Sequence, residues 1–182
     1  ALLQVFGGHG YLKNITNNLS MIQIFTYFIY KKGKNDLAEI KKVLNLDNIF
    51  PYIDNLSSIN LNYYHKGQQL GWHFDNASFA ITLMLQASTL GGEFEYVTEG
   101  RDSNNNYINK KLISNIIDGN NKPKKLDVND GTLILFDGRN YLHRVTPVQS
   151  DTPRILITLN YNEENNIELS ENARLTFFGR TS

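Results

Sequence analysis

Three segments of the chain alternate between apolar positions and positions that bear polar side chains. This period of two predicts strands whose two faces differ. The apolar faces are Ile59, Leu61 and Tyr63; Phe79, Ile81, Leu83 and Leu85; and Ile155, Ile157, Leu159 and Tyr161. The opposite faces are Asn60, Asn62 and Tyr64; Ala80, Thr82, Met84 and Gln86; and Arg154, Leu156, Thr158 and Asn160. We expect the apolar faces to pack beneath helices and the mixed faces to line a solvated cavity.

Helical patterns are concentrated in the first part of the chain. Residues 18–31 are expected to form a largely buried helix, and Asn35-Asp36 can cap a second helix with an apolar stripe. A third helix is predicted from about Asn105 to Ile117, because apolar residues recur there on one face before the stop signal Gly119. The helices therefore flank the strands rather than alternate with them.

Two further strands are predicted at residues 131–137 and 143–148, joined by a turn at Gly138-Arg139-Asn140. A chain rich in strands, with few helices and two facing sheets, indicates a mainly β protein with flanking helices. The best match is a double-stranded β-helix, the jelly-roll or cupin-like architecture.

The length of 182 residues suits one domain with a single packed core. We expect this domain to span residues 1–182, with a helical N-terminal part at about 1–50 and a jelly-roll core at about 58–162. The sequence begins at Ala1 without a methionine, so we expect a missing or trimmed N-terminal segment rather than a cleaved signal.

Charge and composition exclude several classes of protein. Basic and acidic side chains balance at 18 each, so no net positive field draws the protein to nucleic acid or to an anionic membrane. The absence of cysteine excludes disulfide frameworks, thiolate zinc sites and cysteine nucleophiles, and it fits the reducing cytoplasm, where we expect the protein. No run of about 18 apolar residues occurs, so we expect no membrane span.

The candidate chemistry lies in His73, Asp75 and the distant His143. Two imidazoles and one carboxylate can occupy one face of an octahedral Fe(II) ion and leave three positions open. The H-x-D spacing gives His73 and Asp75 the same parity, so both can reach one ion. On spacing alone, two ordinary histidines and a turn aspartate explain the pattern at least as well.

The residues around these candidate ligands form five motifs in order. They are Tyr64-His65-Lys66-Gly67-Gln68 with the following H-x-D pair, Gly91-Gly92-Glu93-Phe94, residues 131–136, residues 142–148, and Arg154. Together they resemble the 2-oxoglutarate/Fe(II)-dependent oxygenase superfamily, and the first motif resembles its prolyl-hydroxylase-like pattern. The resemblance covers roughly residues 60–161 and implies an oxidative enzyme.

Within that superfamily, residues 70–75, 91–96, 142–148 and 177–180 resemble small bacterial enzymes that hydroxylate or chlorinate free amino acids such as lysine. The radical halogenases of that branch have glycine in place of the ligand carboxylate. This chain has Asp75 there, so the resemblance implies hydroxylation of a small substrate rather than chlorination.

The resemblance also implies a set of roles. His73, Asp75 and His143 would hold Fe(II), and Arg154 would pair its planar guanidinium with a carboxylate of the cosubstrate 2-oxoglutarate. Tyr64 would hydrogen-bond the cosubstrate, O₂ would be the second cosubstrate, and ascorbate is a candidate reductant. A surface ion pair for Arg154 and a core position for Tyr64 are the simpler alternatives.

Five further residues are candidates for contact with the substrate: Asn76, Asp54, Thr158, Asn160 and Trp72. Thr158 and Asn160 share the parity of Arg154, so they should face the same cavity. Asn76 either lines the mouth of that cavity or caps a turn. For Asp54 and Trp72, a turn carboxylate and a packing residue are the expected alternatives.

Three rival functions stay open from the sequence. The enzyme alternative is a peptidyl hydroxylase of the prolyl type. The alternative from another class is a non-catalytic jelly-roll binding module, which would consume no 2-oxoglutarate. A zinc hydrolase with the same three ligands is the third, although it would leave Arg154 without a purpose.

Overall fold

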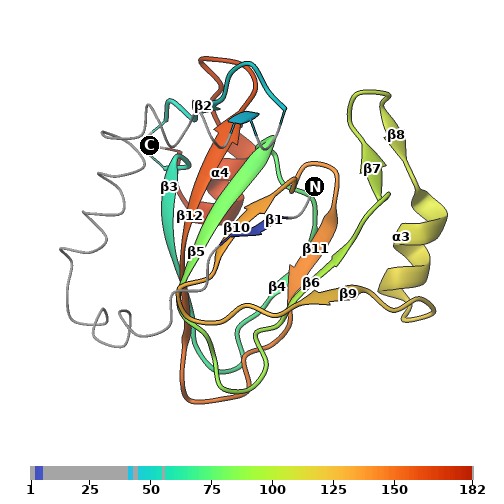
Figure 1. Cartoon of the computed structure of the whole chain (residues 1–182), viewed down its shortest axis with the longest axis vertical. Helices are drawn as coiled ribbons and strands as arrows, with labels where there is room; N and C mark the ends of the chain where they lie inside the picture. Colours follow the sequence, from blue (N-terminus) through green and yellow to red (C-terminus); the bar gives the residue numbers. More distant parts are fainter. Residues whose placement is uncertain (1–2, 6–40, 43–44, 55, 182) are drawn as a thin grey trace.

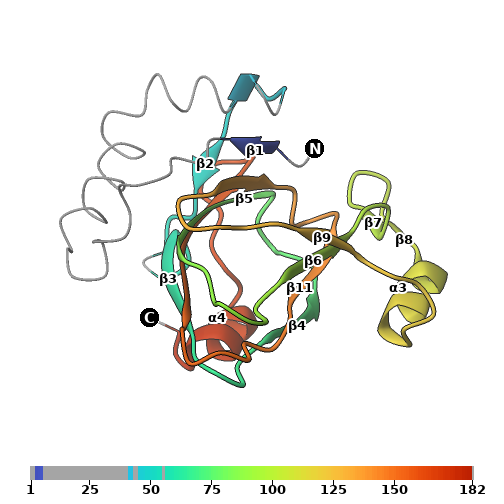
Figure 2. The same cartoon turned by 60° about the horizontal axis from the view of Figure 1, so that its bottom comes forward.

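The computed structural model describes residues 3–5, 41–42, 45–54 and 56–181. Two antiparallel sheets face each other, as Figure 1 and Figure 2 show from two directions. The larger sheet contains β1 (Leu3–Val5), β10 (Leu133–Phe136), β5 (Phe79–Gln86), β12 (Arg154–Asn162), β2 (Phe50–Pro51) and β3 (Ile59–Tyr64). The smaller sheet has the order β4 (Leu70–His73), β11 (Leu142–Val145), β6 (Phe94–Val97) and β9 (Lys124–Leu126). The predicted mainly β, double-stranded β-helix architecture is confirmed.

The predicted alternation sets which side of the larger sheet faces the smaller one. Ile81 of β5 and Ile157, Leu159 and Tyr161 of β12 are buried together in one apolar cluster on the far side of that sheet. Asn60 and Asn62 of β3 and Thr158 and Asn160 of β12 line a cavity on the near side. The strands predicted at residues 59–64, 79–86 and 154–161 are therefore confirmed, and β12 runs one residue further to Asn162.

The apolar face of β3 behaves differently from the expectation. Leu61 and Tyr63 are 56% and 47% exposed, so this edge strand leaves these two side chains uncovered, whereas Ile59 packs against the apolar cluster. The helices predicted at residues 18–31 and after Asn35-Asp36 lie outside the described residues, apart from helical Lys41 and Lys42.

The third helix begins later than predicted. α3 spans Lys110–Ile117, because the side chain of Asn109 caps it by accepting a hydrogen bond from Leu112 N at 3.1 Å. The preceding residues are extended: β8 (Tyr107–Ile108) pairs with β7 (Arg101–Asp102) as a short hairpin. Figure 1 shows this hairpin and α3 to one side of the two sheets.

The C-terminal helix α4 (Glu171–Phe178) closes one end of the space between the sheets. Ser170 caps its N-terminus, and Gly179 ends it in the left-handed conformation with φ 68°. Leu169 and Phe178 pack with buried Tyr52 and Ala77, which places the helix beside the cavity. Among the described residues, none of the helices is both long enough and apolar enough to cross a membrane.

Candidate metal centre and cavity

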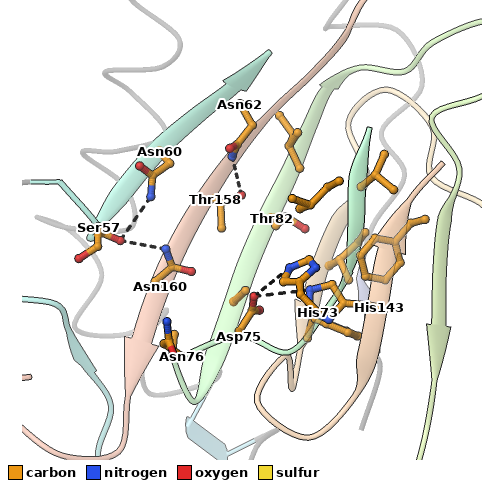
Figure 3. A pocket seen from close by; sticks show the side chains of 18 of the residues that line it. Ser57, Asn60, Asn62, His73, Asp75, Asn76, Thr82, His143, Thr158 and Asn160 are labelled. Carbon is orange, nitrogen blue, oxygen red and sulfur yellow. Dashed lines mark hydrogen bonds and ion pairs between the residues drawn. The ribbon is translucent and has the colours of Figure 1, made fainter. Parts of the chain in front are cut away.

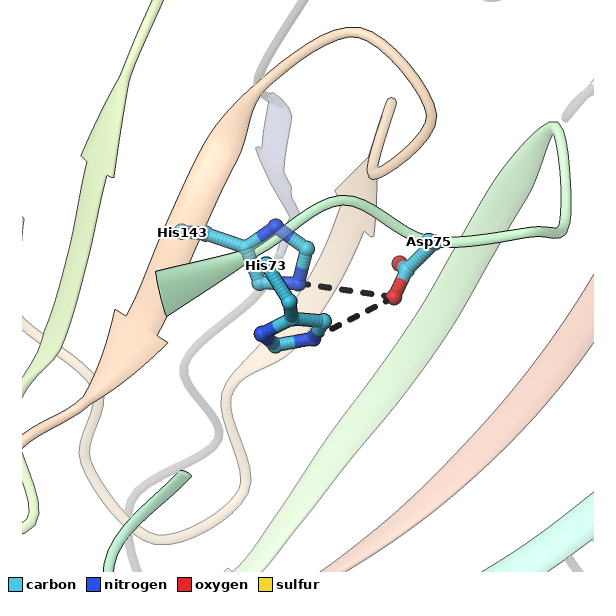
Figure 4. Close-up of side chains that lie close together, drawn as sticks. All are labelled: His73, Asp75 and His143. Atoms are coloured by element: carbon cyan, nitrogen blue, oxygen red, sulfur yellow. Dashed lines mark ion pairs between the residues drawn. The ribbon is translucent and has the colours of Figure 1, made fainter. Parts of the chain in front are cut away.

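Strand pairing brings the two histidines together. His73 ends β4 and lies directly opposite His143 of β11 in the antiparallel register. Their ring centroids are 4.0 Å apart, and Asp75, two residues beyond β4, reaches back so that its Oδ1 lies 3.5 Å from the Nε2 of each ring. One donor atom from each of the three residues falls within 4.8 Å of the other two (Figure 4). Strand pairing and the segment after β4 therefore bring the three predicted ligands around one point.

Backbone carbonyls fix the tautomer of both imidazoles. His73 Nδ1 lies 2.8 Å from Gly71 O, and His143 Nδ1 lies 2.8 Å from Tyr141 O. A carbonyl oxygen only accepts, so each Nδ1 carries the proton and donates it. In the neutral ring the Nε2 lone pair is then free and points toward Asp75, which is the orientation that a metal ligand requires.

The electrostatics of the centre favour a bound cation. Burial works against ionisation of Asp75, but hydrogen bonds and charge from His143 and His73 outweigh it and hold the pKa of this carboxyl well below its usual range. Burial lowers the pKa of His73, but Asp75 dominates and the net pKa is raised. The carboxylate is thus ionised and compensated by positive charge, and a divalent ion satisfies the same three atoms.

Two backbone contacts hold Asp75 in place. Asp75 N donates to Gly138 O at 2.8 Å, and the guanidinium of Arg101 donates from Nη2 to Asp75 O at 3.1 Å. The carboxylate packs flat against the turn, because a Cβ built on Gly138 would lie only 1.7 Å from Asp75 Oδ2. The turn at Gly138-Arg139-Asn140, predicted as a simple connection, therefore shapes the metal centre.

Arg154 is a buried cation that forms no ion pair with a carboxylate of the described residues. It lies on β12 opposite Tyr64, with its guanidinium carbon 5.4 Å from the Tyr64 ring centre, and only 2% of the residue is exposed. Its Nε and Nη1 have no hydrogen-bond partner in the described part of the chain. Burial lowers the pKa of Arg154 to about 10, so the guanidinium stays charged at neutral pH. An uncompensated buried cation with free N–H groups is a site for an anion.

The metal centre and Arg154 line one cavity of about 260 Å³ between the sheets. Tyr64, Asn76, Thr158 and Asn160, all predicted as site residues, also line it. Thr158 and Asn160 line the same cavity as Arg154, as the parity argument predicted. Figure 3 shows Thr158 and Asn160 on β12 of the larger sheet, across from the two histidines.

Tyr52, Asn60 and Asn62 are among the lining residues that sequence reasoning missed. Asn60 and Asn62 share the parity of Tyr64, so the alternation of residues 59–64 already contained their signal. Tyr52 had no such signal in the sequence, because it reaches the cavity from a loop and not from an alternating strand. Burial raises the pKa of Tyr52 to about 12, so its phenol remains a hydrogen-bond donor.

Asp54 and Trp72 do not contact the cavity, which corrects two predicted substrate residues. The carboxylate of Asp54 accepts hydrogen bonds from Leu56 N, Ser57 N, Ser57 Oγ and Leu169 N, so its lone pairs are used within the protein. Trp72 packs in an apolar cluster on the outer side of the smaller sheet, with the Arg144 guanidinium carbon 4.7 Å from its ring centre.

Replacing Asp54 with alanine is expected to destabilise the fold by about 1–3 kcal/mol, because three backbone N–H groups and one hydroxyl lose their acceptor. One of these N–H groups belongs to Leu169, so the segment that leads into α4 would loosen. Urea unfolding measures the change. Asp151→Ala is the matched control, because its side chain is 92% exposed in an ion pair with Lys66, and it should change stability by less than about 1 kcal/mol. Equal losses in the two variants would contradict this role.

Comparison with known proteins identifies related sequences and folds. A sequence model of the family described as Halogenase D matches residues 40–176. No curated protein matches the chain in sequence. Among solved structures, an oxidoreductase of the 2OG-Fe(II) oxygenase family from Burkholderia pseudomallei is similar, with a TM-score of 0.55 and 17% identity over 79% of this chain and 56% of that chain.

Two prolyl hydroxylase structures are also similar at lower scores. One is a prolyl-4-hydroxylase of Pseudomonas putida, with a TM-score of 0.46 and 14% identity over 74% of this chain and 65% of that chain. The other is the viral collagen prolyl hydroxylase of Paramecium Bursaria Chlorella virus-1, with a TM-score of 0.46 and 18% identity over 88% of this chain and 74% of that chain. The chain spans 56% of the length of the Burkholderia structure, whose likeness shows the shared fold.

Proposed function

The chain belongs to the Halogenase D family, and from that premise we propose that it is a 2-oxoglutarate- and Fe(II)-dependent dioxygenase that hydroxylates an unactivated C–H bond of a small substrate. One observation carries the proposal. The same cavity holds a two-histidine, one-carboxylate ligand set and a buried guanidinium with free N–H groups. The first fits Fe(II) and the second fits the carboxylate of a 2-oxo acid. A zinc hydrolase or a sugar-binding module would not need the buried guanidinium of Arg154.

Each residue then has a defined part. His73, Asp75 and His143 would hold the metal on one face, Arg154 would anchor 2-oxoglutarate, and Tyr64 lies beside the guanidinium on the neighbouring strand. Fe(II) with 2-oxoglutarate, when bound, supplies the oxygen activation that replaces a C–H hydrogen by hydroxyl while 2-oxoglutarate becomes succinate and CO₂. The protein orients the target carbon toward the metal and keeps water out of the cavity between the sheets.

Asp75 favours hydroxylation over chlorination, although the family is named for a halogenase. Its Oδ1 lies 3.5 Å from both imidazole nitrogens, so the carboxylate fills the third ligand position that a halide would need. A cavity of about 260 Å³ favours a small substrate such as a free amino acid over a peptidyl substrate. We further propose that residues 1–182 form one oxygenase domain that works in the cytoplasm.

Succinate formation with Fe(II), 2-oxoglutarate and O₂ tests the proposal, with free amino acids and prolyl peptides supplied separately in chloride buffer. We expect basal succinate, stimulation by an amino acid, and a product that has gained one oxygen atom by mass spectrometry. His143→Ala should abolish succinate, whereas the matched variant His65→Ala should not, because His65 is exposed, lies tilted against the Tyr63 ring and does not line the cavity. A chlorinated product would overturn the hydroxylase assignment, and no succinate under any condition would overturn the enzyme class.

A further inference from the structure

The wall of the cavity opposite the metal centre is built from amide side chains. Asn60 and Asn62 of β3 and Thr158 and Asn160 of β12 point from the larger sheet toward the cavity, and we call these four residues the amide wall (Figure 3). The register pairs Thr158 with Asn60 on adjacent strands, so the four side chains form one continuous patch. A substrate held between this patch and the histidines would present a carbon to the metal.

Internal hydrogen bonds engage one N–H of each amide NH₂ group in the amide wall. Asn62 Nδ2 donates to Thr158 Oγ1 at 3.0 Å, and Asn160 Nδ2 donates to Ser57 O at 2.9 Å. Asn60 Nδ2 donates to the same Ser57 carbonyl at 3.4 Å. Because a carbonyl only accepts, Ser57 O orients Asn60 and Asn160 with their NH₂ groups toward the protein, and Asn62 has its NH₂ group toward the Thr158 hydroxyl.

The side-chain oxygen atoms of the three asparagines are unpaired within the described part of the chain. The described residues provide no hydrogen-bond donor to the Oδ1 of Asn60, Asn62 or Asn160. None of these atoms is sealed off as a buried unsatisfied group, so a ligand in the cavity can reach them. An amide oxygen only accepts hydrogen bonds. The amide wall therefore offers three unpaired acceptor oxygens to the cavity, and these suit a group that carries N–H donors.

Charge selects among the groups that carry N–H donors. The histidines are neutral when they bind a metal ion. Apart from them, the described residues that line the cavity include two charged side chains, Asp75 and Arg154. Their charges, together with those of Fe(II) and 2-oxoglutarate, cancel. A side-chain ammonium of the substrate on the amide wall would be a buried cation without a counter-charge, which is costly. A substrate carboxylate would bring acceptors against acceptors. A carboxamide is neutral and offers two N–H donors, which matches the patch.

We propose that the amide wall binds a side-chain carboxamide, so that the substrate is a neutral amino acid of the glutamine or asparagine class rather than a basic one such as lysine. This inference rests on the proposed function of the cavity. It gives Asn60 and Asn62 a role in specificity and narrows the amino acid expected from the sequence resemblance.

The test compares isosteric pairs in the succinate assay. Glutamine and asparagine differ from glutamate and aspartate only in the group that meets the amide wall. We expect the amides to be preferred by about 10- to 100-fold in kcat/KM, the cost of leaving one or more buried polar groups unpaired. Lysine and ornithine should stimulate succinate formation no more than the acids do.

A charge change in the wall should switch this preference. Asn62→Asp keeps the shape of the side chain, and Thr158 can turn its hydroxyl to donate to the new carboxylate. We expect the variant to lose the preference for amides and to gain stimulation by lysine or ornithine of about 10-fold. Asn121→Asp, an exposed asparagine after α3, is the matched control and should behave like the wild type.

The outcomes separate this inference from the proposed function. Basal succinate with equal stimulation by amides and acids, or with lysine preferred by the wild type, would refute the role of the amide wall and leave the iron enzyme intact. Basal succinate with no response to any of these amino acids would refute it as well. No succinate at all would refute the proposed function, and the inference with it.

Discussion

Gly138→Ala is expected to weaken metal binding by about 10- to 100-fold, the range for residues that support metal ligands, and to abolish most turnover. The reason is space. An added Cβ would lie 1.7 Å from Asp75 Oδ2, 2.5 Å from its Cγ and 2.9 Å from its Cβ, so the carboxylate must leave the position from which it faces both histidines. The backbone hydrogen bond from Asp75 N to Gly138 O holds the two segments together, so they cannot simply move apart. Titration with Co(II), followed by its visible absorption, measures the affinity.

A control and a double variant separate this effect from misfolding. Gly71→Ala adds the same methyl group on β4, near His73, where no atom lies within 4 Å of the new Cβ, and it should bind Co(II) like the wild type. Asp75→Gly removes the three atoms that lie nearest to the Cβ added by Gly138→Ala. In that background Gly138→Ala should cost little thermal stability, whereas in the wild type it should cost several degrees. Wild-type Co(II) affinity in Gly138→Ala would contradict the steric role of this turn.

The sequence predicted the parts of the site that follow from strand parity. Once residues 59–64 and 154–161 are strands, Tyr64, Arg154, Thr158 and Asn160 must share a face, and the structure places them in one cavity. Asn60 and Asn62 followed from the same rule but were not singled out. Parity works because the backbone of a strand sets the direction of each side chain without reference to its partners.

Features that depend on contacts between distant segments could not be read in this way. Asp54 carries the same carboxylate whether it meets a substrate or Leu169 N, 115 residues away, and the structure is needed to decide between them. Gly138 had the signature of an ordinary turn, since nothing local signals that Asp75 will pack against it. The start of α3 was misplaced because Tyr107 and Ile108 find strand partners in β7, which overrides their helical spacing.

Arg154→Met is expected to have two effects of opposite sign. The affinity for 2-oxoglutarate should fall by roughly 30-fold to several thousand-fold, because a buried charged partner of the cosubstrate contributes about 2–5 kcal/mol. The stability of the protein without cosubstrate should rise, because methionine removes a cation that is 2% exposed and has two guanidinium nitrogens without a hydrogen-bond partner among the described residues. Cosubstrate KM in the succinate assay and thermal unfolding without ligands measure the two quantities.

Arg144→Met provides the contrast on the outer side of the smaller sheet. Arg144 Nε donates to Glu95 Oε2 at 2.7 Å, and the Glu95 side chain is 7% exposed, so this variant leaves a buried carboxylate with only Lys125 at 3.8 Å. We expect it to lower the unfolding temperature and to leave the KM for 2-oxoglutarate unchanged. The opposite signs distinguish a cation held for a ligand from a cation held for the fold. An Arg154→Met protein that is less stable and binds 2-oxoglutarate normally would show that Arg154 is structural, and the cosubstrate would then have to bind elsewhere.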